Sequence, residues 1–413
     1  MMSSQSTLQT VHTDREFKLG YHRIKKTGLE SRPFLCIFVT EIFIHHMERL
    51  LFTFILTICS VLTLHAQSPE FNGDQVTFRI EGEYATEVKL DGSWLPVPQM
   101  MQKNNGLWEI ICDGIPADFH TYCFIVDGVR IPDPSNPLLI KDGLDQCSGL
   151  YVEGPLSRSY SECRHRGNID YVWYDSRILG GNRRMSVYTP YGYDKNKTAR
   201  YPVLYLLHGE GGDEESWLSA GRVAVILDNL IDAGRAVPMI VVMPNGNIGE
   251  QASRSFGLPK IEGSLTKGYG ATAFESSLAG EIVPFIESHY RAVPKKAYRA
   301  VGGLSYGGRQ AFNAAYMYAD KFDYVCPMSM NLDDTTNLRA DLLRMKQHGV
   351  KLFWMGCGSA DEGALASSQL VHDTMNDIHL FHTFYKNSGG HDWKSWRQYL
   401  NAFLPMIFKY YTD

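Results

Sequence analysis

Residues 301–311 read VGGLSYGGRQA, and four glycines surround Ser305 in this stretch. A Gly-x-Ser-x-Gly match is a weak signal by itself in a chain with 37 glycines. The residues on either side strengthen the match, because YRAV at 298–301 is predicted to form a strand and GRQAFNAAYMYA at 308–319 is predicted to form a helix. Ser305 is therefore predicted at a strand–turn–helix corner, which is the place of the nucleophile in an elbow.

The same corner explains the flanking glycines. Gly303 and Gly307 are expected to let strand and helix pass closely without a Cβ clash. The N-terminal end of the helix also favours the negative charge that a reacting serine develops. A glycine-rich turn in which Ser305 only caps the helix is the alternative interpretation. A base and an acid elsewhere in the chain would distinguish the two.

Apolar runs alternate with amphipathic stretches from about residue 200 to the C-terminus. YPVLYLLHG at 201–209 and PMIVVMPNG at 238–246 are almost continuously apolar, which is typical of strands buried on both faces of a parallel sheet. This alternation predicts the α/β class, with a doubly wound sheet of the α/β-hydrolase type. Further strands are expected at 324–330, 351–359 and 379–387, and helices at 219–234, 276–290, 337–349, 363–376 and 393–410.

A serine nucleophile needs a base, and the base needs an acid that orients it. In α/β-hydrolases the acid and then the histidine follow the serine along the chain. Asp361 follows the predicted strand KLFWMGCGS and His391 follows the predicted strand HLFHTFYKN, so both lie where strands of the sheet end. Ser305, Asp361 and His391 are therefore the predicted catalytic residues. Asp361 as a helix cap and Glu362 as the acid remain alternatives.

A glycine-rich loop in LLHGEGGDEESW, residues 206–217, follows the first buried strand. Glycines there allow backbone N–H groups to point into a cleft, and the N–H groups of Glu210 and Tyr306 are expected to form an oxyanion hole. His208 precedes the glycines and is expected to brace the loop rather than to act as the base. The histidines expected to be structural or exposed are His372, His379 and His382.

Composition argues against several classes of function. The net charge is −5 and the pI is about 6.3, so no basic field is available for nucleic acid or an anionic membrane surface. The glycine-rich loop lacks the Gly-Lys-Ser/Thr ending of a phosphate-binding loop, and the chain contains no HExxH motif. Neither a cofactor nor a metal is therefore expected.

Residues 68–155 show a different sequence pattern, in which short strand-like segments are separated by Gly and Asp-Gly. QVTFRIEG and LWEIICDG are examples, and their spacing predicts a small antiparallel β-sandwich. Trp94 and Trp108 belong either to its core or to an interface. The cysteines after Gln67 are spaced too widely for a disulfide scaffold or a zinc site. Cys112 and Cys123 are the pair that a hairpin would bring face to face.

Residues 47–66 read as a secretory signal peptide. Met47 starts a short charged segment, an apolar run extends from Leu50 to Leu64, and Ala66 precedes the expected cleavage point. This interpretation makes 1–46 a mis-assigned upstream extension, and the mature protein secreted or periplasmic without stable membrane insertion. The alternative is a membrane anchor with a cytoplasmic tail, although a 15-residue run is short for a membrane span.

Several motifs together carry a family resemblance. The stretches YPVLYLLHGEGGDEESW, IVVMPNG, VGGLSYGGRQA, GCGSADE and GGHDWKSWRQYLNAFLP occur in the order found in the putative-esterase family, which the chain resembles over about residues 165–410. That family includes feruloyl and acetyl xylan esterases of carbohydrate esterase family 1, mycolyltransferases and enterochelin esterases. The segment 68–155 resembles the early-set, immunoglobulin-like domain that precedes such esterases and is itself similar to glycogen-binding modules.

The resemblance implies an α/β-hydrolase domain over 165–413 with Ser305, Asp361 and His391 as its triad. It further implies a secreted serine esterase that acts on feruloyl or acetyl esters of plant cell-wall polysaccharide, with an ester-bearing oligosaccharide or polysaccharide as partner. An enterochelin-type siderophore esterase and a non-catalytic carbohydrate-binding protein are the alternatives. Glu210 departs from the family pattern, because a carboxylate beside the oxyanion hole must point away from it or bond elsewhere.

Overall fold

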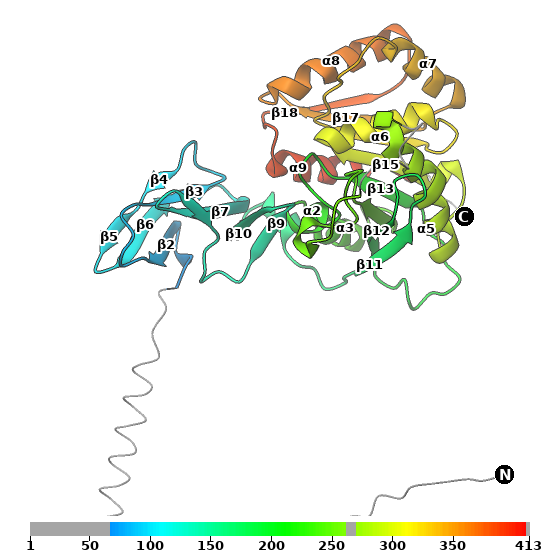
Figure 1. Ribbon diagram of the computed structural model, residues 1–413. Helices are drawn as coiled ribbons and strands as arrows, with labels where there is room; N and C mark the ends of the chain where they lie inside the picture. Colours follow the sequence, from blue (N-terminus) through cyan, green and yellow to red (C-terminus); the bar gives the residue numbers. More distant parts are fainter. Residues whose placement is uncertain (1–66, 262–269, 410–413) are drawn as a thin grey trace, which may run out of the picture. The chain divides into compact units, whose positions relative to one another are not determined.

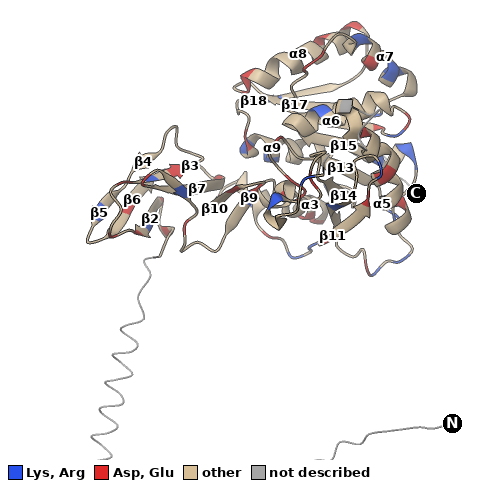
Figure 2. Ribbon diagram, viewed as in Figure 1, with Lys and Arg blue, Asp and Glu red and all other residues tan. Residues whose placement is uncertain are grey.

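The computed structural model describes residues 67–261 and 270–409, which belong to one compact unit, His65–Asp413. The expected signal peptide at 47–66 and the extension at 1–46 lie outside the described residues. No helix in the described part of the chain is both long and apolar enough to cross a membrane. Acidic and basic side chains are interspersed along the ribbon (Figure 2).

An eight-stranded sheet forms the centre of the hydrolase domain, residues 165–409 (Figure 1). Its strand order is β11-β12-β14-β13-β15-β16-β17-β18. The pairs β11–β12 and β12–β14 are antiparallel and the later pairs are parallel, in agreement with the predicted fold class. The strands are β11 (Asn168–Asp175), β12 (Asn182–Thr189), β13 (Val203–Leu207), β14 (Ile240–Pro244), β15 (Arg299–Leu304), β16 (Tyr324–Met328), β17 (Leu352–Gly358) and β18 (Thr383–Asn387).

Both faces of this sheet are buried. Val203 and Tyr205 of β13 pack into one hydrophobic cluster, whereas Leu204 and Leu206 pack into another on the opposite face. Alternate side chains of a strand point to opposite faces, so a strand with helices on both sides is apolar throughout. The helices are α2 (Ser216–Ser219), α3 (Val223–Asp232), α4 (Ala273–Ser277), α5 (Val283–His289), α6 (Ser305–Met317), α7 (Leu338–His348), α8 (Glu362–Asp377) and α9 (Trp393–Phe403).

Two of the predicted elements start later than expected. The helix predicted from residue 219 begins at Val223, because Arg222 has a left-handed φ of +50° that a helix cannot include. The strand predicted from residue 379 begins at Thr383, since His379 has a φ of +53°. Periodicity in the sequence located the elements, but backbone reversals at single residues set their ends.

Residues 70–152 are all-β, as predicted, and form two antiparallel sheets, which we call the β domain. The sheet orders are β1-β2-β6-β5 and β4-β3-β7-β10-β9, with β8 paired to β7. Trp108 is buried in their common core, and Trp94 stacks on Phe78 with ring centroids 5.7 Å apart. The strands are β1 (Glu70–Asn72), β2 (Gln75–Glu81), β3 (Val88–Gly92), β4 (Gln99–Met100), β5 (Gln102–Asn104), β6 (Leu107–Asp113), β7 (Asp118–Val126), β8 (Val129–Ile131), β9 (Leu139–Asp142) and β10 (Asp145–Val152).

The pairing of Cys112 with Cys123 across a hairpin is wrong. Cys112 lies opposite Val76 in one sheet, whereas Cys123 belongs to β7 in the other sheet. The neighbour of Cys123 is Cys147 on β10, and their free thiol sulfur atoms are 3.0 Å apart. Two closely spaced strands in the sequence fall in different sheets here, and sequence distance gave no sign of this.

Arg397 of α9 joins the β domain to the hydrolase domain. Its side chain is only 3% exposed, and its guanidinium donates to the carbonyl oxygens of Phe119 on β7 and Ala220 after α2, at 2.6 and 2.9 Å. The carboxylate of Asp118 lies 3.8 Å away. A buried cation thus satisfies acceptors from both domains.

Replacement of Arg397 by Met is expected to lower the free energy of unfolding by about 3 kcal/mol, because two buried carbonyls lose their donor and the buried Asp118 carboxylate loses a nearby cation. Urea denaturation followed by circular dichroism measures the change. Arg339→Met on the exposed face of α7 is the control and should leave the midpoint unchanged. An unchanged midpoint for Arg397→Met would show that these acceptors find other partners.

Candidate active site

Ser305 lies where β15 ends and α6 begins. Its φ is +55°, a left-handed value that is uncommon for a residue with a side chain. Such backbone strain persists only where the surrounding structure enforces it, and it concentrates at functional sites. The strand–turn–helix corner expected from the sequence is therefore present, and the serine at its apex has the backbone of a nucleophile elbow.

The two elbow glycines have no room for a side chain. A Cβ at Gly303 would lie 2.5 Å from the carbonyl oxygen of Gly307. A Cβ at Gly307 would overlap the carbonyl oxygen of His208 and lie 2.7 Å from that of Leu207. The N-terminus of α6 thus rests directly on the end of β13, and only glycine permits this approach.

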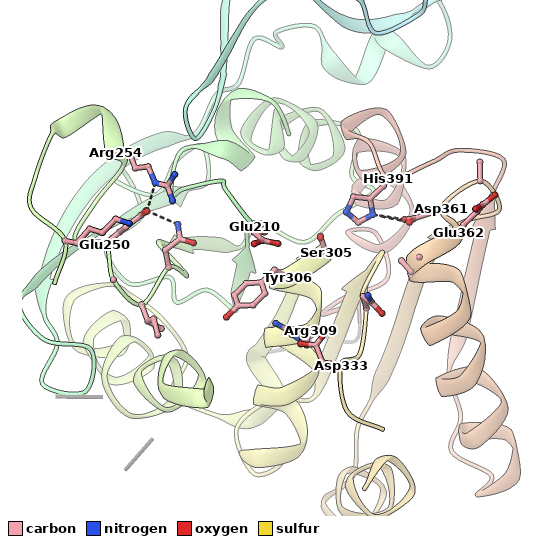
Figure 3. A pocket seen from close by; sticks show the side chains of 18 residues that line it. Glu210, Glu250, Arg254, Ser305, Tyr306, Arg309, Asp333, Asp361, Glu362 and His391 are labelled. Carbon is pink, nitrogen blue, oxygen red and sulfur yellow. Dashed lines mark hydrogen bonds and ion pairs between the residues drawn. The ribbon is translucent and has the colours of Figure 1, made fainter. Parts of the chain in front are cut away.

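Asp361 and His391 are hydrogen-bonded to each other. The Nδ1 atom of His391 lies 3.1 and 3.0 Å from the two carboxylate oxygens of Asp361, whose side chain is 4% exposed (Figure 3). Asp361 occupies the cap position of α8, yet its side chain makes no capping hydrogen bond. The carboxylate is therefore used to orient the imidazole, and this geometry favours Asp361 over Glu362 as the acid.

Ser305, Asp361 and His391 line one cavity of about 890 Å³, and Figure 3 shows Ser305 beside His391. No hydrogen bond between Ser305 and His391 occurs among the described residues, but catalytic contacts of this kind often tighten only when substrate binds. Burial, and then the charge of Asp361, raise the pKa of the nearby Cys357 thiol to about 11. This thiol stays protonated, so it is no rival nucleophile.

His208, His372, His379 and His382 do not line this cavity. His208 is buried, and its Nε2 accepts a hydrogen bond from the Gly246 N–H at 2.8 Å while its Nδ1 lies 2.7 Å from the Gly209 carbonyl oxygen. It therefore joins the glycine-rich loop to the loop after β14, as a bracing residue would. His372 and His382 contact each other at 2.7 Å beside α8 and line a separate hollow together with His379.

Glu210 and Tyr306 also line the cavity. The sequence predicted that the carboxylate of Glu210 points away from the oxyanion hole or bonds elsewhere, but it has no hydrogen-bond or ion-pair partner among the described residues and lies on the same side of the cavity as Ser305 (Figure 3). A negative charge is thus part of the cavity wall next to the expected oxyanion hole.

Sequence reasoning missed the charged pairs in the wall of the cavity. Arg254 donates to Glu250 at 2.5 Å, and Arg309 forms an ion pair with Asp333 (Figure 3). Arg309 was detectable in principle, because it lies one helical turn after Ser305 on α6. Asp333 lies on a loop 24 residues after Arg309, so no local pattern predicts that pair, whereas Glu250 lies four residues before Arg254 and was detectable in principle. The described residues contain no cluster of three or more metal-ligating side chains.

A strained serine in one cavity with a carboxylate–imidazole pair, on a mixed sheet, is the arrangement typical of α/β-hydrolases. Residues 176–356 match the family described as "Putative esterase". The similarity of the chain to curated proteins includes an endo-1,4-beta-xylanase/feruloyl esterase of Xylanibacter ruminicola, with 29% identity over 322 residues. That match covers 75% of this chain and 41% of the relative, so the chain spans less than half of the relative's length.

Solved structures show the same fold. An enterobactin esterase from Shigella flexneri has a TM-score of 0.61 and 19% identity, and the match covers 82% of this chain and 95% of that one. A ferulic acid esterase from Anaeromyces mucronatus has a TM-score of 0.51 and 22% identity, with 63% and 98% covered. At these identities the comparison establishes the α/β-hydrolase fold and does not choose between substrates.

Replacement of Gly307 by Ala is expected to lower the free energy of unfolding by about 2 kcal/mol or more, because the added methyl group overlaps the end of β13. Gly280→Ala is the matched control, since the nearest atom to a Cβ there is 3.9 Å away and the site is helical. Urea midpoints should fall for Gly307→Ala and stay level or rise for Gly280→Ala. Equal midpoints would mean that the elbow is not tightly packed.

Proposed function

We propose that the protein is a serine esterase that hydrolyses carboxylic esters through an acyl-enzyme. The observation that carries the proposal is the Asp361–His391 hydrogen bond in the same cavity as a serine with a φ of +55°. Serine, imidazole and carboxylate are the three groups that acyl transfer requires, and here they follow three different strands of one sheet. The family match supports the same chemistry.

Each residue has a defined task in this mechanism. The Ser305 hydroxyl attacks the ester carbonyl, and His391 takes the serine proton and passes it to the departing alcohol. Asp361 holds the Nδ1 proton and stabilises the imidazolium that forms. The N–H groups of Glu210 and Tyr306 bind the oxyanion. Water activated by His391 then releases the acid and restores Ser305.

The proposed substrate is plant cell-wall polysaccharide such as xylan, or its oligosaccharides, bearing feruloyl or acetyl esters. The similarity to the xylanase/feruloyl esterase supports this assignment. The cavity also suits it, because ion-paired carboxylates and guanidiniums around the serine offer both acceptors and donors to sugar hydroxyls. A polymeric substrate of this kind lies outside the cell. The proposal therefore includes secretion of the protein, directed by a signal peptide at 47–66.

A siderophore esterase is the second candidate, favoured by the fold likeness to the enterobactin esterase. An anionic catecholate ligand would need unpaired cations around the serine. Arg254 and Arg309 are already paired with Glu250 and Asp333, so Lys260 is the remaining lysine or arginine among the described residues of the cavity lining, where Glu210 and Glu362 add negative charge. These charges disfavour the siderophore reading, and the Asp361–His391 pair disfavours a binding protein without catalysis.

Replacement of Ser305 by Ala is expected to lower kcat/KM for a p-nitrophenyl ester by about 10³-fold or more, because the acyl-enzyme can no longer form. Asp361→Asn should cost about as much by misorienting the imidazole, without a change in fold by circular dichroism. Ser305→Ala that still hydrolysed the ester at the parent rate would exclude the proposed mechanism.

The acyl group and the glycan are tested with protein that begins at Gln67. Methyl hydroxycinnamates, acetylated xylan and enterochelin are offered at equal ester concentration, and release of acid is measured by chromatography. Release of ferulate or acetate at a rate at least tenfold above that from enterochelin is the expected result. Faster cleavage of enterochelin would replace the polysaccharide assignment by the siderophore assignment.

A further inference from the structure

A turn of the β domain touches the loop that carries the expected oxyanion hole. β9 and β10 are joined by a two-residue turn, and Gly143 has a φ of +59° as the first turn residue. A Cβ at Gly143 would overlap the carbonyl oxygen of Gly211. We call Lys141–Gly143 the hairpin tip. Its backbone rests directly against the chain just after Glu210.

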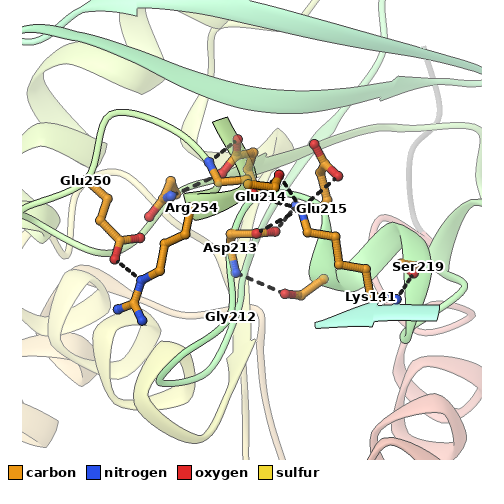
Figure 4. Close-up of polar contacts among 12 residues, drawn as sticks. Lys141, Gly212, Asp213, Glu214, Glu215, Ser219, Glu250 and Arg254 are labelled. Atoms are coloured by element: carbon orange, nitrogen blue, oxygen red, sulfur yellow. Dashed lines mark hydrogen bonds and ion pairs between the residues drawn. The ribbon is translucent and has the colours of Figure 1, made fainter. Parts of the chain in front are cut away.

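Lys141 ties together two loops of the hydrolase domain. Its Nζ donates to Ser253 at 2.5 Å and lies 3.3 Å from carboxylate oxygens of both Asp213 and Glu215 (Figure 4). Its backbone N–H donates to the Ser219 hydroxyl at 2.7 Å. Residues 213–219 continue the oxyanion loop, whereas Ser253 belongs to the segment that supplies Glu250 and Arg254 to the cavity.

Asp142 contacts the segment that follows His391. Its carboxylate accepts a hydrogen bond from the Trp393 Nε1–H at 2.8 Å, two residues after His391. The Trp393 ring packs edge-to-face on Trp217 and on Trp396, with centroids 5.2 and 5.1 Å apart. The Trp396 ring in turn lies 5.1 Å from the His391 imidazole. An aromatic row therefore connects the hairpin tip to the proposed base.

We propose that the hairpin tip positions the active site, with Lys141 holding the oxyanion loop and Asp142 holding the segment after His391. The inference rests on the proposed esterase function and extends it to the β domain. None of the described residues that line the cavity belongs to the hairpin tip. Lys141 and Asp142 are thus positioning residues, which act through the residues that they hold.

Lys141 balances the charge of a buried carboxylate, that of Asp213. The side chain of Asp213 is 1% exposed, and its Oδ2 atom has no hydrogen-bond donor but lies 3.3 Å from the Lys141 ammonium. Glu214 is also buried and is paired with Arg184 at 2.5 Å. Removal of one member of a buried ion pair leaves an uncompensated charge, which the structure relieves by moving the loop. A shift of about 1 Å in a catalytic group costs about 10²-fold in rate.

The test uses Lys141→Met and Asp142→Ala in the full chain, with a small p-nitrophenyl ester as substrate. Both variants are expected to lower kcat by about tenfold or more with KM within about threefold, because a small ester does not reach the hairpin tip. The rate at which a fluorophosphonate labels Ser305 should fall in parallel, since labelling needs the same oxyanion hole. Lys141→Arg should recover most of the activity by restoring the charge.

Lys394→Met is the matched control. Lys394 lies 3.8 Å from Asp118, a carboxylate of the β domain that is also 1% exposed and keeps Arg397 as a partner. Asp118 pairs with Val152, at the opposite end of β10 from the hairpin tip. Lys394→Met therefore weakens the same domain contact away from the oxyanion loop, and its kcat should stay within about twofold of the parent.

Parent kcat in folded Lys141→Met and Asp142→Ala would overturn the inference while leaving the esterase assignment intact. Equal losses in Lys394→Met would overturn it as well, because general loosening of the domain contact would then be the cause. If Lys141→Met does not fold, the kcat of Asp142→Ala tests the inference by itself. This variant is expected to fold, because it removes one acceptor from a partly exposed site. A parent protein that neither cleaves esters nor labels at Ser305 would instead refute the proposed function.

Discussion

The close approach of α6 to the end of β13 is the constraint on which the site depends. Gly307 lies against the carbonyl oxygens of Leu207 and His208 with no room for a Cβ. This contact brings the elbow serine beside the glycine-rich loop that follows β13. The parallel strands β17 and β18 end at the same edge and deliver Asp361 and His391. Ser305 and the Asp361–His391 pair thus lie in one cavity because β15, β17 and β18 run parallel and because Gly303 and Gly307 allow the close approach.

Buried charge is the second organising feature. Asp213 and Glu214 are almost fully buried, and such carboxylates are costly unless cations reach them. Arg184 comes from β12 and Lys141 comes from the β domain, so the loop after β13 is held by charges from two distant segments. The same loop is joined to the loop after β14 through His208. Loops that carry function are often mobile, and this one is tied at several points.

The fold and the choice of substrate depend on different parts of the molecule. α/β-hydrolases with quite different substrates share the sheet and the elbow, so the fold alone does not choose a substrate. Substrate choice depends on the cavity wall, which here includes the ion pairs Arg254–Glu250 and Arg309–Asp333 together with Glu210. Such a wall suits neutral, hydroxyl-rich ligands better than anionic ones. The β domain, on this view, contributes to the site through the hairpin tip whether or not it binds carbohydrate itself.

Sequence alone determined the α/β class, the all-β segment before it and the candidates Ser305, Asp361 and His391, because strand periodicity, glycine spacing and the order of triad residues are local patterns. Tertiary structure decided what depends on contacts between distant segments. It placed Glu210 in the cavity, paired Arg309 with Asp333, and set Cys123 beside Cys147 rather than Cys112. It also brought Lys141 to Asp213 and Asp142 to Trp393. A buried polar group such as Asp213 needs a partner, but only the folded chain decides which partner is within reach.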